Sequence, residues 1–398
     1  MIKDGEPVFS SCRGYASHEL GVKNTLSTRF SAASVTKQLT AFAILLLCDR
    51  GLIDPQADAN RYLDAKMQIP AGITVHHLLS HCSGLYNFYN FEDDFYIGAD
   101  RLPFDKKAFF RDWINRRPVT PAGEKFGYNN ANYNLLAWII ENTAEQPYDL
   151  FLRQNIFLPL DMQGAQIDNG LNLLSGRAQN YMHDYGQTVR TPYSNPLFHI
   201  GAGGLVIDSA SLQKWYHCLR ERRLLSERAY KRFFTENSEH YCYGLERHSE
   251  NGRVKYAHGG DMNGTAAYVQ YFFEDDLCLL ILSNNESLNQ YRLGNAMADI
   301  LYGNDPPFSG KPPEIPLSEK QLHCFAGTYL PGKVWIEVRD DKLYLVRVNQ
   351  NIHIELYCTG PDTFVRRWEE SAAPYVLRAP GEETPSVWGF HRVSEAFI

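Results

Sequence analysis

Long apolar runs are missing from this chain, and no stretch of its 398 residues reaches the roughly 18 uninterrupted apolar residues of a membrane-spanning helix. Blocks of basic residues are also missing. Lys and Arg number 39 against 46 Asp and Glu, and they never occur three in a row. Nucleic acids and anionic membranes attract clustered positive charge. The sequence therefore predicts neither a membrane span nor a nucleic-acid partner.

The eight cysteines are scattered, with no Cys-x-x-Cys pair that would indicate a redox motif or a zinc site. His76, His77 and His81 lie close together, but no carboxylate or cysteine follows them at the spacing of metal ligands. We therefore expect no metal and no cofactor. The cysteine pattern and the lack of a signal peptide predict a cytoplasmic location, or a periplasmic one if the native start lies upstream of Met1.

Several motifs of other enzyme classes are absent. The chain has no Gly-x-Ser-x-Gly, which would indicate an α/β-hydrolase. It also has no His-Glu-x-x-His, the signature of zinc peptidases, and no glycine-rich phosphate loop. A hydrolase built on any of these three arrangements is therefore not predicted.

The most informative feature that is present is the tetrad from Ser34 to Lys37, which precedes the apolar run Leu39–Cys48. A helix is predicted from about Ser34 to Arg50, ended by Gly51. Residues three apart on a helix share a face, so the serine and the lysine should be neighbours. A serine hydroxyl is a poor nucleophile until a nearby base takes its proton, so this pair fits seryl acyl transfer.

The tetrad alone proves little, because about one Ser-x-x-Lys is expected by chance in a chain of this composition. A second one runs from Ser211 to Lys214. Only the first is followed, in order, by Tyr128-Asn129-Asn130 and by His258-Gly259-Gly260. This ordered triple resembles the penicillin-recognising serine hydrolases of peptidase family S12: class C β-lactamases, D-Ala-D-Ala carboxypeptidases, esterases and D-aminopeptidases.

Further segments carry the same resemblance across roughly residues 1–305. Leu78–Leu85 is similar to a Leu-Leu-Ser-His-Thr-Ser-Gly-Leu segment of the family, Gly201–Leu205 to a glycine-rich stretch before a helix, and Tyr243–Leu245 to a Tyr-Gly-Leu upstream of the third motif. The match at Leu78–Leu85 includes His81, which supports reading that histidine as structural.

The resemblance implies a role for each motif residue. Ser34 would be the acyl-enzyme nucleophile, with Lys37 as its base after burial and neighbouring positive charge lower the lysine pKa. Tyr128 would pass a proton to the leaving group and activate water for deacylation. Asn130 would hydrogen-bond Lys37 and the substrate amide. The oxyanion hole would be the backbone N–H groups of Ser34 and Asp261.

His258 stands where most penicillin-binding members have a lysine. A largely neutral histidine attracts a substrate carboxylate less than a lysine does, which counts against a dedicated carboxypeptidase or β-lactamase and resembles the His-x-Gly of D-aminopeptidases and some esterases. Gly259 and Gly260 are expected to let substrate lie against the strand. We also hypothesise that Asp261, or the acidic loop Glu92–Asp94, neutralises a substrate ammonium.

The predicted fold is α+β: one antiparallel sheet covered by helices, plus a mostly helical lobe, with the site in a cleft between them. By resemblance this is the β-lactamase/transpeptidase-like fold. The elements expected from local patterns are helices over Ala131–Thr143 and Asp208–Arg222, a hairpin over Thr265–Phe273 and Leu277–Ser283, and a first hairpin turn at Met1–Gly5 with a second strand over Pro7–Cys12.

Three parts are predicted along the chain. Residues 1–305 form the serine hydrolase domain and residues 306–317 a stiff proline-rich linker. Residues 318–398 hold short alternating strands and are predicted to form a small antiparallel β-barrel, similar to the lipocalin-like modules of D-aminopeptidase-like members.

The favoured function is a serine hydrolase that forms a Ser34 acyl-enzyme on a small amide or peptide, as D-aminopeptidases do. One alternative is a carboxylesterase, a weak β-lactamase or a D-Ala-D-Ala carboxypeptidase acting on a small ester or amide. Another, of a different class, is a penicillin-binding sensor that deacylates slowly, or a scaffold whose barrel is the working part. Assembly into a homo-oligomer is left open.

Overall fold

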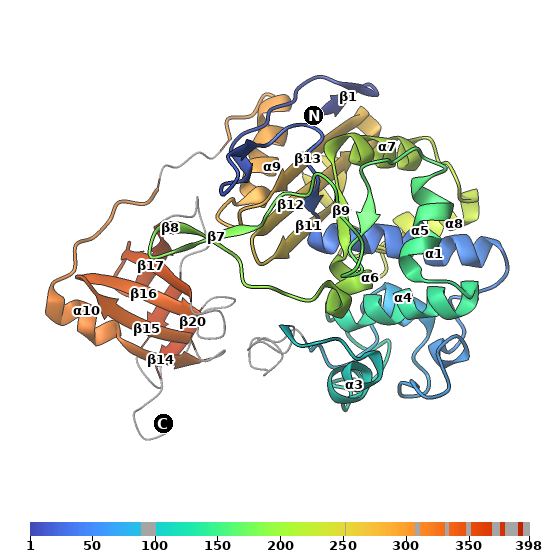
Figure 1. Cartoon of the computed structure of the whole chain (residues 1–398), viewed down its shortest axis with the longest axis horizontal. Coiled ribbons are helices and arrows are strands. Elements are labelled where there is room, and N and C mark those ends of the chain that lie inside the picture. Colours follow the sequence, from blue (N-terminus) through green and yellow to red (C-terminus); the bar gives the residue numbers. More distant parts are fainter. Residues whose placement is uncertain are drawn as a thin grey trace.

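A computed structural model describes residues 1–88, 101–250, 252–306, 311–330, 334–347, 352–367, 375–378 and 389–392. Figure 1 shows a large helix-and-sheet part and a smaller barrel to its left, joined by the segment that follows α9 (Gln290–Leu301). No helix in these residues is long and apolar enough to cross a membrane. The acidic segment Glu92–Asp94 lies outside the described residues.

The main sheet has six antiparallel strands in the order β10-β11-β12-β13-β1-β2. Their bounds are β10 (Glu246–Glu250), β11 (Arg253–Met262), β12 (Thr265–Phe272), β13 (Leu277–Ser283), β1 (Ile2–Lys3) and β2 (Glu6–Pro7). The predicted hairpin of β12 and β13 is therefore confirmed, and the third motif lies within β11.

The second strand predicted at Pro7–Cys12 is too long, because β2 ends at Pro7. The amides of Val8 and Phe9 both point to the carbonyl of Met1, at 3.0 and 3.5 Å. The regular pairing of β1 with β2 ends at Ile2 and Pro7, and the side chains of Val8 and Phe9 are exposed.

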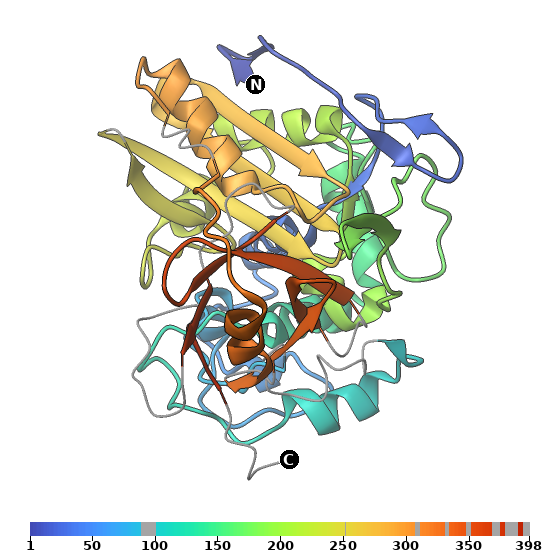
Figure 2. The same cartoon turned by 90° about the vertical axis from the view of Figure 1, so that its left-hand side faces the viewer.

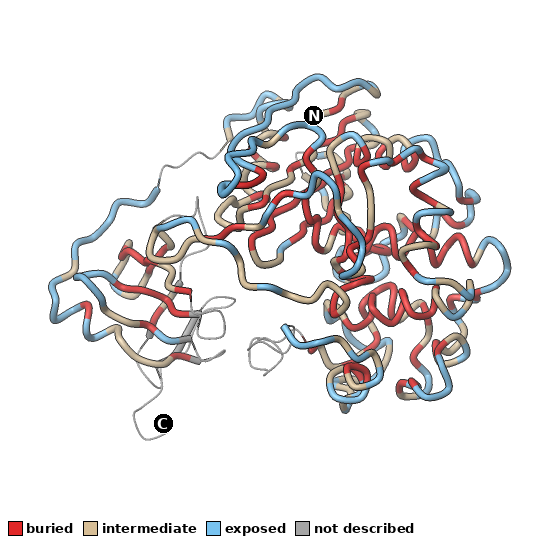
Figure 3. Tube along the Cα trace, viewed as in Figure 1, coloured by how far each residue is buried: buried red, intermediate tan, exposed pale blue. Residues whose placement is uncertain are grey.

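The first of the predicted helices is buried along nearly its whole length. It consists of a 3₁₀ turn (Ala33–Val35) and α1 (Thr36–Asp49), in which every residue from Thr36 to Leu47 is buried. The helix is therefore buried on all sides, as expected of a core helix. Figure 3 shows this burial continuing through α4 (Asn130–Ala144) and the central strands, whereas the N-terminal segment is exposed.

Helices cover both faces of the sheet. Helix α1, together with α7 (Ser209–Arg220) and α8 (Glu227–Phe234), covers one face, and α9 packs on β12 and β13 from the other. Figure 2 shows α9 in orange lying across these strands. The Asp208 side chain caps α7 by accepting a hydrogen bond from the Ser211 amide at 2.8 Å, which confirms the helix predicted over Asp208–Arg222.

The helical lobe is centred on α4, which confirms the helix predicted at Ala131–Thr143. The other helices of the lobe are α2 (Val75–Leu79), α3 (Lys106–Phe109), α5 (Tyr148–Leu152) and α6 (Ile200–Gly203). Helix α4 contacts α1, α2, α5 and α6. It therefore links the second motif at its N-terminus to the helix that carries the first.

The smaller strands lie outside the main sheet. A three-stranded sheet has the order β5-β9-β6, and two hairpins pair β3 with β4 and β7 with β8. Their bounds are β3 (Tyr15–Ser17), β4 (Val22–Lys23), β5 (Phe30–Ser31), β6 (Gln166–Ile167), β7 (Tyr181–Asp184), β8 (Gln187–Arg190) and β9 (Leu205–Ile207).

The predicted C-terminal barrel is confirmed as a closed barrel of β14 to β20, with α10 (Glu319–Phe325) packed on β15. Its strands are β14 (Gly327–Leu330), β15 (Val334–Arg339), β16 (Lys342–Arg347), β17 (Ile352–Cys358), β18 (Thr363–Arg366), β19 (Tyr375–Arg378) and β20 (Gly389–Arg392). One pair differs from the expected meander: β19 and β20 are parallel. The boundaries at residues 305 and 318 remain predictions.

Candidate active site

The first motif places a buried amine beside a serine hydroxyl. Lys37 is fully buried in the first turn of α1, and its Nζ lies 3.0 Å from Ser34 Oγ, within hydrogen-bond distance. Two acceptors also surround Nζ: Asn130 Oδ1 at 2.8 Å and the carbonyl of Ala202 at 3.1 Å. The structure thus brings together the predicted residues Ser34, Lys37 and Asn130 from three separate elements.

Burial holds the pKa of Lys37 well below its usual range. The positive charge that was expected to help lower this pKa is not among its causes. The contacts of the amine are neutral oxygens and two aromatic rings, with Nζ at 4.7 Å from the Tyr128 ring centre and 5.7 Å from that of Tyr133. Because the Lys37 amine is removed from water and has no carboxylate partner, its uncharged form is favoured.

Tyr128 joins this group from the loop before α4. Its hydroxyl is hydrogen-bonded to Ser34, and burial nevertheless raises its pKa above the ordinary value, so it is a phenol at neutral pH. The ring lies 4.5 Å from that of His81. Asn129 starts α4 by accepting a hydrogen bond from the Ala131 amide at 2.8 Å, which directs the flanking residues Tyr128 and Asn130 toward Lys37.

His258 is buried on β11, and the contacts of its two nitrogens determine its tautomer. Nδ1 lies 2.6 Å from the carbonyl of Gly259, which can only accept, so Nδ1 carries the proton. Nε2 then accepts from the Tyr241 hydroxyl at 3.3 Å. Burial lowers the pKa of His258 to about 4, opposed by the Glu246 carboxylate and assisted by Lys37. The side chain is therefore neutral at pH 7.

The sequence did not identify Tyr241, which lies two residues before the Tyr-Gly-Leu segment. Its contacts with His258 and with the rings of His81, at 4.7 Å, and Tyr128, at 6.1 Å, join strands and loops far apart in the chain. No local pattern marks such a residue, and only its place beside the family segment gave a signal. Gly244, within that segment, lies against Lys37, where an added Cβ would come within 2.5 Å of the Lys37 carbonyl.

Close packing gives a further reason for glycine at positions 259 and 260, beside the expected approach of substrate. A Cβ on Gly260 would lie 2.2 Å from the carbonyl of Ala32, and one on Gly259 would lie 2.0 Å from the Tyr291 hydroxyl. Both spaces are thus occupied by the chain itself. β10 pairs only with the part of β11 that ends at Ala257, so no described strand covers that edge from residue 258 to 262.

Asp261 points away from His258, because side chains alternate along a strand. Its carboxylate accepts hydrogen bonds from Gln290 Nε2 at 2.6 Å and from the Tyr291 hydroxyl at 2.7 Å, both on α9. Burial raises its pKa, against the effect of these two donors. The geometry therefore favours anchoring of α9, and it does not support the predicted contact between this carboxylate and a substrate ammonium.

The clustered histidines have separate structural partners. His76 Nδ1 lies 2.6 Å from the Tyr243 hydroxyl, His77 accepts from the Thr74 amide in a capping box, and His81 Nδ1 accepts from the Asn129 amide at 3.2 Å. Within the described part of the chain, no group of three or more His, Cys, Asp or Glu could hold a metal ion.

The second Ser-x-x-Lys tetrad has no such environment. Ser211 Oγ accepts from the Gly164 amide at 3.0 Å, and Lys214 forms an ion pair with Asp161 on the surface. The serine and lysine are thus each committed to other partners. In the first tetrad the serine and the lysine lie within hydrogen-bond distance of each other, and in the second each binds a different group.

A buried lysine bonded to a serine at the start of a central helix, beside an antiparallel sheet, defines a serine hydrolase of the β-lactamase fold. The chain belongs to the Beta-lactamase family, whose profile matches residues 1–304. The predicted family is thereby confirmed, and with it the enzyme class of serine hydrolase.

Relatives extend this likeness over nearly the whole chain. Penicillin-binding protein 4* of Bacillus subtilis (strain 168) is 25% identical over 431 aligned residues, covering 96% of this chain and 92% of that protein. A D-aminopeptidase of Gluconobacter oxydans (strain 621H) is 24% identical over 412, covering 97% and 74%. The octameric penicillin-binding protein homologue from Pyrococcus abyssi has a similar fold, with a TM-score of 0.68 at 24% identity, covering 94% and 89%.

Proposed function

We propose that this serine hydrolase acts through a Ser34 acyl-enzyme on small amides or peptides with a free amino group, as a D-aminopeptidase does. The observation that carries the proposal is the environment of Lys37 Nζ, which lies within hydrogen-bond distance of Ser34 Oγ, Asn130 Oδ1 and the Ala202 carbonyl. A neutral amine has two protons and one lone pair. With its protons on the amide and carbonyl oxygens, the lone pair is left to accept the proton of Ser34.

The chemical steps follow from this arrangement. Ser34 Oγ bonds to the substrate carbonyl carbon while its proton passes to Lys37 Nζ. The Tyr128 phenol, whose raised pKa keeps it protonated, donates a proton to the leaving nitrogen as the C–N bond breaks, and takes one back from Lys37. Water then attacks the acyl carbon, gives its proton to Lys37 through Tyr128, and displaces Ser34 Oγ, which recovers a proton.

The oxyanion donors in this proposal are the backbone N–H groups of Ser34 and Asp261. Support comes from the packing of the 3₁₀ turn on β11, where Gly260 lies directly against the Ala32 carbonyl. Each such donor is typically worth about 10²–10³ in rate. The uncovered edge of β11 beyond Ala257 would let an extended substrate run beside the strand.

The preference for an amine-bearing substrate rests on charge. Members that bind a substrate carboxylate use a fixed cation at the position of His258, and here that side chain is neutral at pH 7 because its pKa is about 4. The D-aminopeptidase relative aligns with 97% of this chain, so its likeness includes the region of the barrel.

Two alternatives remain from the sequence. A carboxylesterase, weak β-lactamase or D-Ala-D-Ala carboxypeptidase would use the same Ser34 acyl-enzyme on another substrate. A penicillin-binding sensor would form the acyl-enzyme and fail to release it. We also keep the cytoplasmic location as a proposal, and the octameric relative makes a homo-oligomer a proposal worth measuring.

The test is release of p-nitroaniline from D-alanine p-nitroanilide by wild type and by Ser34→Ala, with L-alanine p-nitroanilide, p-nitrophenyl acetate and a chromogenic penicillin in parallel. Release from the D-substrate that vanishes in Ser34→Ala is the expected result. Activity confined to the acetate or the penicillin would replace the aminopeptidase assignment with the esterase or β-lactamase one. A stable adduct without turnover would favour the sensor.

A further inference from the structure

The hairpin of β7 and β8 reaches from the hydrolase part of the chain to the C-terminal barrel. Figure 1 shows it in green beside β17, although its base belongs to the larger part of the molecule. A surface hairpin ordinarily carries few contacts at its tip. This one has specific partners at both ends.

At the tip, Asp184 and Tyr185 bind two barrel strands. Asp184 Oδ1 accepts from the His353 amide at 2.8 Å and lies 3.0 Å from His353 Nδ1, and the Tyr185 amide donates to the His353 carbonyl at 3.0 Å. The Tyr185 ring stacks on the His353 ring at 4.2 Å, and its hydroxyl donates to Glu337 Oε1 at 3.0 Å. Arg339 covers the Tyr185 ring at 4.6 Å. The barrel therefore holds the tip through β15 and β17.

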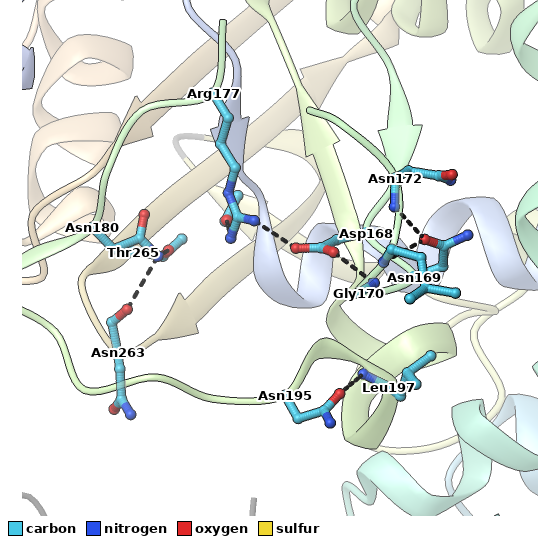
Figure 4. A network of polar contacts seen from close by, with 12 residues as sticks. Asp168, Asn169, Gly170, Asn172, Arg177, Asn180, Asn195, Leu197, Asn263 and Thr265 are labelled. Atoms are coloured by element: carbon cyan, nitrogen blue, oxygen red, sulfur yellow. Dashed lines mark hydrogen bonds and ion pairs between the residues drawn. The ribbon is translucent and has the colours of Figure 1, made fainter. Parts of the chain in front are cut away.

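At the base, Asn180 holds the turn between β11 and β12. Its Nδ2 donates to the carbonyl of Asn263 at 3.3 Å, the contact drawn in Figure 4, and to Thr265 Oγ1 at 3.1 Å. Gly264 of that turn, at φ 71°, fits so closely that an added Cβ would lie 2.4 Å from Thr191 Cγ2 and 2.7 Å from Asn180 Cβ. The base of the hairpin is thus packed directly on the turn.

That turn follows the third motif without an intervening element. Asp261, whose N–H is the proposed oxyanion donor, and Met262 end β11 immediately before Asn263. Met262 Sδ lies 3.1 Å from the Cβ position of Gly203, the neighbour of Ala202, whose carbonyl holds Lys37. A shift of the turn would therefore displace groups on both sides of the site: the Asp261 N–H on one side and the segment of Ala202 and Gly203 on the other.

We infer that the β7–β8 hairpin is a positioning element, through which docking of the barrel fixes the end of β11 that carries the oxyanion donor. Asn180 is its positioning residue at the site, and Tyr185 is its anchor on the barrel. This inference rests on the proposed function, since the oxyanion role of the Asp261 N–H does. Small displacements at a reacting centre have large effects, with about 1 Å costing roughly 10²-fold in rate.

Two variants remove the two ends of this connection. Asn180→Asp keeps the shape of the side chain but replaces the donor of two hydrogen bonds by an acceptor facing the Asn263 carbonyl. Tyr185→Ala removes both the stacking and the hydroxyl at the tip. One matched variant should leave the connection intact: Gln187→Ala, at an exposed position on the same hairpin. Tyr185→Phe keeps the ring on His353 and loses only the hydroxyl bond to Glu337.

The experiment measures amide hydrogen exchange of residues 259–265 together with kcat and KM, using the full chain. We expect Asn180→Asp and Tyr185→Ala to raise exchange at this turn and to lower kcat by about tenfold with KM within threefold, as loss of an interaction made in the transition state requires. Gln187→Ala should resemble wild type in both readouts, and Tyr185→Phe should lie between wild type and Tyr185→Ala.

Unchanged exchange at the turn in a folded Asn180→Asp, or in a Tyr185→Ala whose β17 amides show that the tip has been released, would overturn the inference. So would loss of activity by Tyr185→Ala and Gln187→Ala alike. If Tyr185→Ala does not fold, Asn180→Asp decides alone. Absence of any hydrolysis by wild type would instead count against the proposed function, and exchange at the turn would still decide whether the hairpin positions it.

Discussion

Lys37 is the residue on which the proposed chemistry depends, because it is a buried amine with no carboxylate beside it. Lys37→Met keeps an unbranched side chain of similar length and removes the base. We expect the rate of Ser34 acylation to fall by about 10²–10⁴. The free energy of unfolding should change by no more than about 3 kcal/mol. The variant loses the hydrogen bonds of the amine, but it also avoids the cost of removing that amine from water on folding.

Stopped-flow acylation and urea unfolding of the Lys37→Met variant check both expectations. Wild-type acylation in a folded Lys37→Met variant would show that another group takes the serine proton.

Tyr128 and Tyr133 form a matched pair, since both rings face Lys37. The hydroxyl of Tyr128 is bonded to Ser34, whereas that of Tyr133 donates to the Leu79 carbonyl at 2.9 Å. Tyr128→Phe should therefore lower kcat by about 10²–10⁴ with little loss of stability. Tyr133→Phe should cost about 1–3 kcal/mol in stability, for the unpaired carbonyl, with kcat nearly unchanged.

Steady-state kinetics and thermal unfolding of both tyrosine variants give the comparison. Equal losses of kcat in the two would mean that ring packing, and not the Tyr128 hydroxyl, matters.

At the scale of elements, β11 offers a test in its two glycines. A Cβ at position 260 would meet the backbone carbonyl of Ala32, just before the nucleophile, whereas one at 259 would meet the end of the Tyr291 side chain, which is 40% exposed and can turn outward. Gly260→Ala should destabilise the fold by about 1–3 kcal/mol and reduce kcat/KM by about 10². Gly259→Ala should have a markedly smaller effect on both.

Measuring kcat/KM and the urea midpoint for both glycine variants tests this predicted difference. A Gly260→Ala enzyme as active as Gly259→Ala would contradict the close packing of Ala32 on β11.

Elements whose signals are local were predictable. The helix after Ser34, the helix after Asn130 and the hairpin of β12 and β13 each combine an apolar pattern with a cap or turn signal, and all three are observed. The order of the three motifs also predicted which residues meet, because they match a family arrangement. The same argument excluded the second Ser-x-x-Lys as the nucleophile motif. In the structure its serine and lysine each bind other groups, which agrees with that prediction.

Elements and contacts that depend on distant partners were not predictable. β2 is shorter than the predicted strand because its pairing with β1 ends at Ile2 and Pro7. Tyr241 meets His258, and Tyr291 fills the space beside Gly259, through contacts between elements that no spacing along the chain encodes. The direction of the Asp261 side chain follows from strand alternation, but only once its place in β11 is known.

For the whole molecule, three buried histidines predict that acid weakens the fold. Burial lowers the pKa of His81, His199 and His258, the last two to about 3 and about 4. In the unfolded chain each takes up its proton near pH 6.5, whereas the folded protein does so only at lower pH. Between these values the unfolded state binds more protons, so the free energy of unfolding falls as the pH falls from about 6.5 toward 4.

His258 alone should account for about 2 kcal/mol of this loss at pH 5 and about 3 kcal/mol below pH 4. Urea unfolding of wild type and His258→Gln at pH 7 and pH 5 measures it. We expect the variant to lose about 2 kcal/mol less than wild type between the two pH values. An identical loss would mean that His258 titrates alike in the folded and unfolded protein.

The central claim is that Ser34 becomes acylated. The most direct measurement is the mass of the intact protein, acid-quenched shortly after mixing with a D-alanine p-nitrophenyl ester, followed by peptide mapping of wild type, Ser34→Ala and Ser211→Ala. We predict one D-alanyl adduct on the peptide that contains Ser34 in wild type and in Ser211→Ala, and none in Ser34→Ala. An adduct that persists in Ser34→Ala, or that maps to the Ser211 peptide, would contradict the account.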